Sequence, residues 1–249
     1  MTTTTDPVHL VPPRLRSLAR RSLNRVGLDV SRNPYPYRLN QVLAAREVTT
    51  VVDIGANEGQ FARSLRVNGY DHALLSVEPL QDAHTVLARH AAADPRWTTL
   101  HAAVSDRDGT VSVNVAANSY SSSVLPMTDA HLDADPQSAY RGSEQVQAFT
   151  LDTLVRDHGL DPARSAFKID VQGYESAVLD GATATLATAA VVQVEMSLVE
   201  LYAGQALMPR IAERMAEAGL TLWLLEPGFS DRASGRLLQC DGVFVRATP

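Results

Sequence analysis

A glycine-containing turn directly after a short apolar run is the first place in the sequence where chemistry can be expected. The run from Thr49 to Ile54 leads into Gly55-Ala56-Asn57-Glu58-Gly59, ahead of a segment with helical spacing. A strand, turn and helix in this order bring backbone N–H groups close to a ligand, and glycine leaves room for a close approach. We therefore expect a nucleoside-type cofactor to contact four residues of this segment, Asp53, Gly55, Asn57 and Gly59.

The spacing of the glycines separates two classes of cofactor. Dinucleotide-binding turns follow G-x-G-x-x-G, in which the second glycine admits a pyrophosphate, and here that position holds Asn57. Asp53, just before the turn, would repel a pyrophosphate but suits a zwitterionic cofactor with an ammonium group. The turn therefore favours S-adenosylmethionine and a methyltransferase. A nicotinamide-dependent dehydrogenase, or a cofactor-binding protein without turnover, is the alternative.

Further polar residues follow the next two expected strands. Glu78 comes after the run 72–77, about 20 residues past the turn, where an acid can accept hydrogen bonds from both ribose hydroxyls. Ser105 and Asp106 follow the third expected strand, and in the same topology they would flank the adenine ring. For Asp106 the other interpretation is a plain turn beside Gly109.

Two acids at the ends of later strands, Asp170 and Glu195, are candidates for catalysis. The carboxyl ends of neighbouring parallel strands converge on the ligand crevice of an open α/β sheet. Together the two carboxylates could hold Mg²⁺, which would fix an acceptor hydroxyl and lower its pKa. Without metal, one of them would act as a general base. His131, in a long polar segment, is a third candidate base.

The elements that must position these residues alternate between strand and helix patterns. Apolar strand runs and amphipathic segments follow one another at 49–54, 60–68, 72–77, 83–93 and 97–104, and again from residue 165 to the end. This alternation predicts an α/β fold with a mainly parallel seven-stranded sheet, the Rossmann-like class I methyltransferase architecture. Residues 106–150 interrupt the pattern, and we interpret them as an inserted segment of antiparallel strands and loop that could cover the acceptor.

The first 40 residues differ in composition from the rest. Between Pro12 and Arg32 there are six arginines and a single aspartate, and residues 13–26 have the spacing of a short amphipathic helix. This helix would contact a membrane surface or pack over the main domain. A proline-rich break at 33–37 follows. We thus expect a basic N-terminal appendage and linker over 1–40, and a methyltransferase domain over 41–249.

The composition of the whole chain restricts its partners and its location. The chain has 249 residues, 45% of them hydrophobic, and a net charge of −6, which argues against nucleic acid as the main partner. No apolar run approaches the roughly 20 residues that span a bilayer, and the start lacks the pattern of a signal peptide. We expect a cytoplasmic protein without an integral membrane segment, and a homodimer is compatible with the sequence. The single cysteine, Cys240, reads as a small core residue.

Five spaced blocks together resemble the FkbM family of methyltransferases. They are VVDIGANEGQFA, SVEP, AVSDRDGT, TLDTLV and FKIDVQGYESAVLDGA, and in this order they cover residues 45–200. The resemblance implies a class I fold, S-adenosylmethionine as methyl donor, and an O-methyltransferase. Its acceptor would be a hydroxyl on a sugar, an oligosaccharide or a glycosylated natural product. The ends of the chain lie outside the resemblance, and we expect acceptor choice to be encoded there or in the 106–150 segment.

Overall fold

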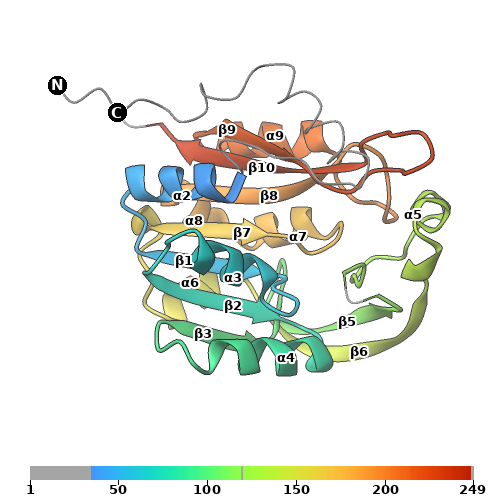
Figure 1. The fold of residues 1–249 in the computed structure, drawn as a ribbon, viewed down its shortest axis with the longest axis horizontal. Coiled ribbons are helices and arrows are strands. Elements are labelled where there is room, and N and C mark those ends of the chain that lie inside the picture. Colours follow the sequence, from blue (N-terminus) through green and yellow to red (C-terminus); the bar gives the residue numbers. More distant parts are fainter. Residues whose placement is uncertain (1–34, 119, 248–249) are drawn as a thin grey trace, which may run out of the picture.

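The computed structural model describes residues 35–118 and 120–247, and a seven-stranded sheet forms its centre (Figure 1). The strand order is β3-β2-β1-β7-β8-β10-β9. Pairs from β3 to β8 are parallel, whereas β10 runs antiparallel to both of its neighbours. The strands span Thr50–Ile54 (β1), Ala73–Glu78 (β2), Trp97–His101 (β3), Ser165–Ile169 (β7), Val191–Ser197 (β8), Leu220–Pro227 (β9) and Gln239–Arg246 (β10). This confirms the predicted α/β class I architecture.

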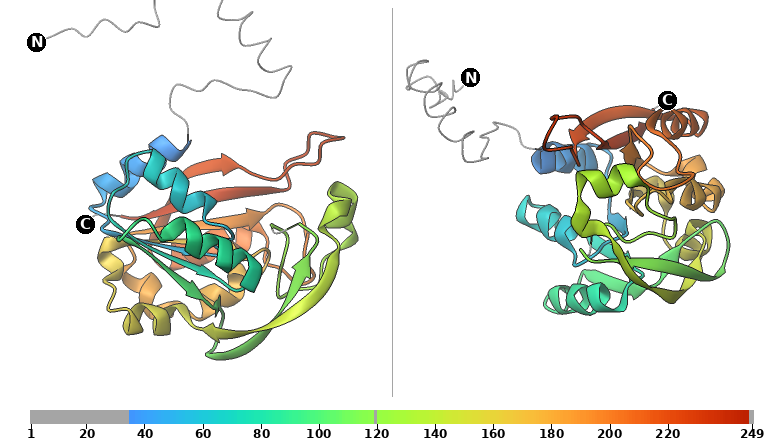
Figure 2. Two further views of the ribbon diagram at one scale, coloured as in Figure 1. Left: turned by 60° about the horizontal axis from the view of Figure 1, so that its bottom comes forward. Right: turned by 90° about the vertical axis from the view of Figure 1, so that its right-hand side faces the viewer.

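Helices cover both faces of the sheet, so that it carries two hydrophobic cores (Figure 2). One face packs against α2 (Tyr35–Ala45), α3 (Gln60–Val67) and α4 (Gln81–Ala91). The other packs against α6 (Leu151–Asp157), α7 (Glu175–Asp180), α8 (Thr183–Thr188) and α9 (Met208–Glu217). Strands buried on both faces are rich in apolar residues, as the central strands are. Each of β1, β2, β7 and β8 nevertheless contains a buried polar residue, namely Asp53, Ser76, Lys168 and Gln193.

A second, three-stranded sheet stands beside the carboxyl ends of the central strands, as the ribbon shows (Figure 1). It contains β4 (Ala103–Val104), β5 (Gly109–Ala116) and β6 (Tyr140–Phe149), in the order β4-β6-β5. β5 and β6 are antiparallel, and β4 joins β6 in parallel. Between β5 and β6 lie α5 (Asp129–Ala134) and the short helix η2 (Pro136–Ser138); a further short helix, η3 (Pro162–Arg164), precedes β7. The 106–150 segment thus carries the expected strands and an unexpected helix.

Three differences from the sequence-based expectation have physical explanations. The run expected as one strand over 97–104 is divided, because β3 ends at His101 and the next residues pair with β6. Helix α2 begins at Tyr35, inside the expected break, since Pro36 lies in its first turn where no N–H is needed. Helix α8 was not expected, because it is short and rich in alanine and threonine and has no clear amphipathic period. The helix expected over 13–26 lies outside the described residues.

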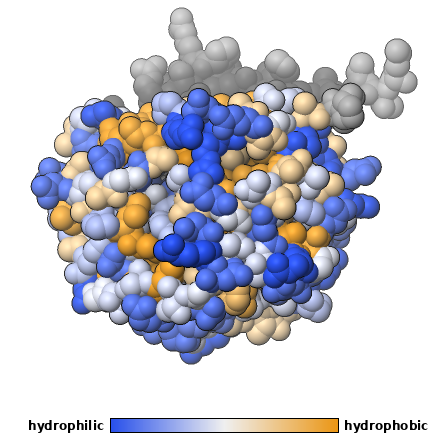
Figure 3. Space-filling view, turned by 180° about the vertical axis from the view of Figure 1, so that it is seen from behind, coloured by the Kyte–Doolittle hydropathy of each residue, from blue (hydrophilic) through white to orange (hydrophobic). Residues whose placement is uncertain are grey.

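The surface does not concentrate apolar residues on the face opposite to that of Figure 1, where hydrophilic and hydrophobic residues are interspersed (Figure 3). No helix among residues 35–118 and 120–247 has the length and apolarity needed to cross a membrane.

Candidate functional site

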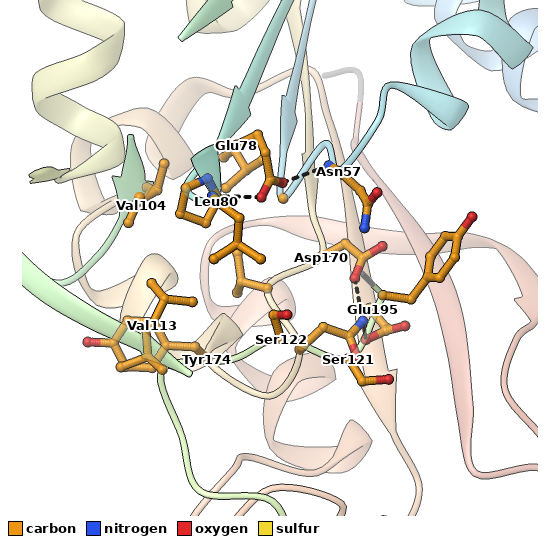
Figure 4. A pocket seen from close by; sticks show the side chains of 18 of the residues that line it. Asn57, Glu78, Leu80, Val104, Val113, Ser121, Ser122, Asp170, Tyr174 and Glu195 are labelled. Carbon is orange, nitrogen blue, oxygen red and sulfur yellow. Dashed lines mark hydrogen bonds between the residues drawn. The ribbon is translucent and has the colours of Figure 1, made fainter. Parts of the chain in front are cut away.

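A pocket of about 360 Å³ lies where the carboxyl ends of β1, β2, β7 and β8 meet the small sheet. The order of the strands reverses beside β1, and such a switch point is where open α/β sheets bind ligands. In the close-up, Glu78 and Asn57 lie together, Asp170 lies next to Glu195, and Val104 and Val113 are on the far side of the view (Figure 4). The pocket therefore joins a polar strand-end region to an apolar one.

Glu78 is the acid that the structure presents at the end of β2. Its Oε2 accepts a hydrogen bond from the backbone N–H of Asn57 (2.7 Å), and its Oε1 accepts one from Leu80 (2.9 Å). Asn57 adopts the left-handed conformation (φ 48°), which turns its N–H toward the carboxylate. Burial raises the pKa of Glu78 to about 7, although the two backbone bonds oppose this shift. Each oxygen keeps a lone pair with which it can accept a further hydroxyl.

The two glycines of the turn are required by the chain itself. A Cβ at Gly55 (φ 78°) would lie 1.8 Å from the carbonyl oxygen of Asp170, and one at Gly59 (φ 84°) would lie 2.8 Å from the Leu87 and Trp97 side chains. Both glycines thus have a structural reason, and their contact with a cofactor stays a prediction. Gly55 lines the pocket, whereas Gly59 is not among its lining residues.

Asp53 lies beneath the pocket, not on its wall. It is fully buried, and the Lys168 ammonium lies 3.5 Å from its Oδ1. Burial raises the pKa of Asp53, which the charge of Lys168 counteracts. Lys168 in turn donates a hydrogen bond to Asp170 Oδ2 at 2.9 Å. The lysine is therefore an ion-pair partner of two acids, which indicates a structural role for this residue.

Ser105 and Asp106 also lie outside the pocket wall. The Ser105 hydroxyl is buried and hydrogen-bonds to Asp106 Oδ1 (3.0 Å) and to the Tyr174 hydroxyl (3.1 Å), and Tyr174 does line the pocket. Leu80, Val104 and Val113 supply apolar surface at this end instead. Such a surface suits the face of an aromatic base. Ser105 contributes indirectly, because its hydrogen bond holds the Tyr174 hydroxyl.

Asp170 and Glu195 lie next to each other at the other end of the pocket, as their strand positions predict (Figure 4). The side-chain amide of Gln172 donates from Nε2 to Asp170 Oδ1 and to Glu195 Oε2, each at 2.9 Å. Gln239 on β10 donates a second bond to Glu195 Oε2, at 2.8 Å. Within the described chain no residue donates a hydrogen bond to Glu195 Oε1.

The charges around Glu195 determine its protonation. Burial raises its pKa well above the usual value, and the neighbouring acids Asp170, Glu175 and Asp241 raise it further. Lys168 opposes them. Glu195 therefore binds a proton more strongly than a solvated carboxylate does.

The donor set around the two acids does not fit the Mg²⁺ expected in one of the two schemes. Both oxygens of Asp170 and Oε2 of Glu195 already accept hydrogen bonds from amide or ammonium groups. Mg²⁺ needs oxygen ligands in near-octahedral arrangement, and residues 35–118 and 120–247 contain no group of three or more acidic, histidine or cysteine side chains placed to hold a metal.

His131, the third candidate base, lines the pocket from α5. It is buried, its Nδ1 has no hydrogen-bond partner, and burial lowers its pKa. Its ring packs edge-on against Tyr202 and tilted against Phe229 from the β9–β10 hairpin. The 106–150 segment is thus anchored to the main domain through aromatic contacts at the pocket.

Several residues of the site carry no signal that sequence patterns can show. Gln172 stands within the block FKIDVQGYE but has neither charge nor helical or strand periodicity, and its placement depends on a positive φ. Gln239 and Phe229 come from the terminal hairpin, whose approach to β8 is a matter of topology.

Comparisons with known proteins bear on the same region. The family described as "Methyltransferase FkbM domain" matches residues 53–222, about two thirds of the chain. No protein with a curated description matches the sequence.

Solved structures with a similar fold are distant in sequence. A TehB-like SAM-dependent methyltransferase from Corynebacterium glutamicum is 13% identical, with a TM-score of 0.40 over 97% of this chain and 100% of that one. The 1,6-didemethyltoxoflavin-N1-methyltransferase of Burkholderia thailandensis, determined with S-adenosylhomocysteine, is 13% identical, with a TM-score of 0.42 over 100% and 93%. A SAM-dependent methyltransferase from Aquifex aeolicus is 11% identical, with a TM-score of 0.43 over 97% and 98%. At these values the likeness carries no argument about the acceptor.

Proposed function

The chain belongs to the FkbM methyltransferase family, and we propose that it is an O-methyltransferase that uses S-adenosylmethionine. We further propose that the acceptor is a hydroxyl of a sugar, an oligosaccharide or a glycosylated natural product. The observation that carries the proposal is the half-buried Glu195 carboxylate, which lines the pocket and whose Oε1 has no donor within the described chain.

The cofactor end of the pocket supports the placement of S-adenosylmethionine. Glu78 is held by two backbone N–H groups, so that its lone pairs face the pocket for a ribose diol. Leu80, Val104 and Val113 offer apolar surface to the adenine. Asp53 would act on the cofactor from beneath the turn, through Lys168 and Asp170, and not by direct contact. The bound cofactor would supply a methyl group on a positively charged sulfur.

The acceptor end supports a hydroxylated substrate. Ser121 and Ser122 lie near Glu195 in the close-up (Figure 4), and Asn118 also lines the pocket. Phe229 adds an aromatic surface on which a sugar ring can pack. Glu195 Oε1 would accept the proton of the acceptor hydroxyl while the hydroxyl oxygen takes the methyl group from the cofactor sulfur. Holding the hydroxyl oxygen in line with the methyl carbon would supply much of the acceleration. His131 is the second candidate for the proton, because it lines the same end and is neutral at pH 7.

Labelling with tritiated S-adenosylmethionine tests the acceptor class. The purified enzyme is incubated with a lysate of the source cells, which is then divided into carbohydrate, small-molecule, protein and RNA fractions. We expect label in the carbohydrate or glycosylated small-molecule fraction, and no label with Glu195→Gln. Label that enters RNA or protein would refute the proposed acceptor. Stoichiometric binding of NADH without binding of S-adenosylhomocysteine would refute the cofactor as well.

A further inference from the structure

The amide of Gln172 lies between two acids that like charges should drive apart. Its Nε2 is 2.9 Å from Asp170 Oδ1 and 2.9 Å from Glu195 Oε2, so one NH₂ group joins both carboxylates. The orientation of the amide is fixed by chemistry, because the Tyr202 hydroxyl donates to Gln172 Oε1 at 2.8 Å. A reversed amide would place Oε1 against two carboxylate oxygens, and no hydrogen bond could form there.

The backbone around Gln172 is built to hold this orientation. Gln172 has φ 52°, a conformation that residues other than glycine rarely adopt and that concentrates at functional sites. Ser123 donates a hydrogen bond to its carbonyl oxygen at 2.6 Å. On either side, Glu175 Oε1 accepts from the N–H groups of Val171 and Gly173, at 3.1 Å each. The loop is therefore fixed by Ser123 of the β5–β6 connection and by Glu175 of α7.

Gly173 shows that the packing against Tyr202 leaves no freedom at this point. A Cβ at Gly173 (φ 94°) would lie 2.8 Å from the Tyr202 side chain. Tyr202 is fully buried, and the Ser121 carbonyl oxygen, 3.2 Å from its hydroxyl, is a second and longer acceptor for the same hydrogen. The Tyr202 ring thus packs against the loop, and its hydroxyl orients the Gln172 amide by a hydrogen bond.

We propose that Gln172 is a positioning residue that joins the Asp170 and Glu195 carboxylates at the place where a bridging divalent cation would otherwise lie. Its two N–H groups offset the repulsion between the acids, and Gln239 holds the same Glu195 oxygen from β10. Oε1 of Glu195 is thereby left for the acceptor. The site then needs no metal. This differs from the Mg²⁺ scheme, because amide and ammonium groups already donate to the carboxylate oxygens that would bind the ion. This inference rests on the proposed role of Glu195 as base.

Binding of Mn²⁺, followed by electron paramagnetic resonance and by thermal shift, tests whether the Gln172 amide occupies the place of a divalent cation. We expect no saturable binding to the wild-type chain. Gln172→Glu, which replaces the amide donor by a third carboxylate, should gain saturable binding and a melting temperature that rises with Mn²⁺. Gln147→Glu, an exposed position on β6, should gain neither. Saturable binding to the wild type that Asp170→Asn removes would overturn the proposal.

The titration of Glu195 tests the positioning role without any acceptor. Carboxyl ¹³C resonances of glutamate-labelled protein are followed against pH, and Glu195→Gln assigns the signal. Gln172→Met removes the donor that favours the ionised form, so the pKa of Glu195 should rise by about one to two units. Gln147→Met should leave it unchanged. An unchanged Glu195 titration in Gln172→Met would overturn the proposal.

Tyr202→Phe gives the same test if Gln172→Met does not fold. It removes only the hydroxyl that orients the amide, so a smaller shift in the same direction is expected. Binding of S-adenosylhomocysteine, whose ribose would lie at Glu78, reports that the pocket is intact in each variant. A shifted Glu195 titration together with absent hydroxyl methylation would leave the role of Gln172 standing and refute the proposed function instead.

Discussion

The affinity for the cofactor should depend on pH through Glu78. Burial places the pKa of this acid at about 7, and its two oxygens face the pocket while backbone N–H groups hold them. In our proposal the ribose hydroxyls donate to the ionised carboxylate, so that binding below pH 7 must first remove a proton. Each pH unit below the pKa then costs about 1.4 kcal/mol. The dissociation constant of S-adenosylhomocysteine should be about tenfold higher at pH 6 than at pH 8.

Isothermal titration calorimetry in buffers of different ionisation enthalpy measures both the affinity and the proton released. Glu78→Gln should bind about ten- to 150-fold more weakly at pH 8, because hydrogen bonds to a charged acceptor contribute about 1.5–3 kcal/mol. The affinity of Glu78→Gln for S-adenosylhomocysteine should be nearly the same at pH 6 as at pH 8. Glu217→Gln, exposed on α9, is the matched control and should behave as wild type.

The contribution of the ribose can be measured separately with a smaller ligand. Methylthioadenosine keeps the ribose diol but lacks the amino acid, so it should show the same pH slope as the full cofactor product. A wild-type slope that is flat between pH 6 and 8, or one that persists unchanged in Glu78→Gln, would refute the role of Glu78 as ribose acceptor.

Three further predictions concern stability. Gly55→Ala should lower the free energy of unfolding by about 3 kcal/mol or more, since its Cβ would meet the Asp170 carbonyl at 1.8 Å; Gly142→Ala, with no atom within 4 Å, is the control in urea denaturation, and equal effects would contradict the reasoning. Lys168→Met should cost about 3–5 kcal/mol, because it leaves Asp53 and Asp170 without their cation; adding Asp53→Asn should restore part of the loss, and no restoration would argue against the ion pair. Without cofactor, Glu78 binds its proton more tightly in the folded chain than in the unfolded one, so its contribution to stability falls as pH rises from about 4.5 to about 7. Subtracting the Glu78→Gln denaturation curve from that of the wild type should reveal this slope, and a difference that rises with pH would have the wrong sign.

The central sheet and the cofactor turn could be predicted because they follow local rules. A β-branched run ending in glycine marks β1, and the alternation of strand and helix patterns fixes the parallel order around it. Glu78, Asp170 and Glu195 follow from the position of strand ends alone, since parallel strands bring those ends to one edge.

The remainder of the site depends on contacts between segments that are distant in the sequence. The residues Ala103 and Val104 continue an apolar run, yet they pair with Ala148 and Phe149 of β6, which lie 45 positions later in the sequence. Helix α5 is short and polar, and it is held by packing against the β9–β10 hairpin rather than by its own propensity. The place of Gln172 requires a left-handed conformation that only the surrounding bonds impose.

The most direct test of the account is the chemical identity of the methylated atom. The enzyme is supplied with S-adenosylmethionine that carries a ¹³C methyl group and with the labelled acceptor fraction, and the product is examined by ¹H–¹³C correlation spectroscopy. We predict a new O-methyl signal on a sugar hydroxyl, which disappears in Glu195→Gln although this variant still binds S-adenosylhomocysteine with wild-type affinity. An N-methyl signal, or an O-methyl signal of undiminished rate in Glu195→Gln, would contradict the account.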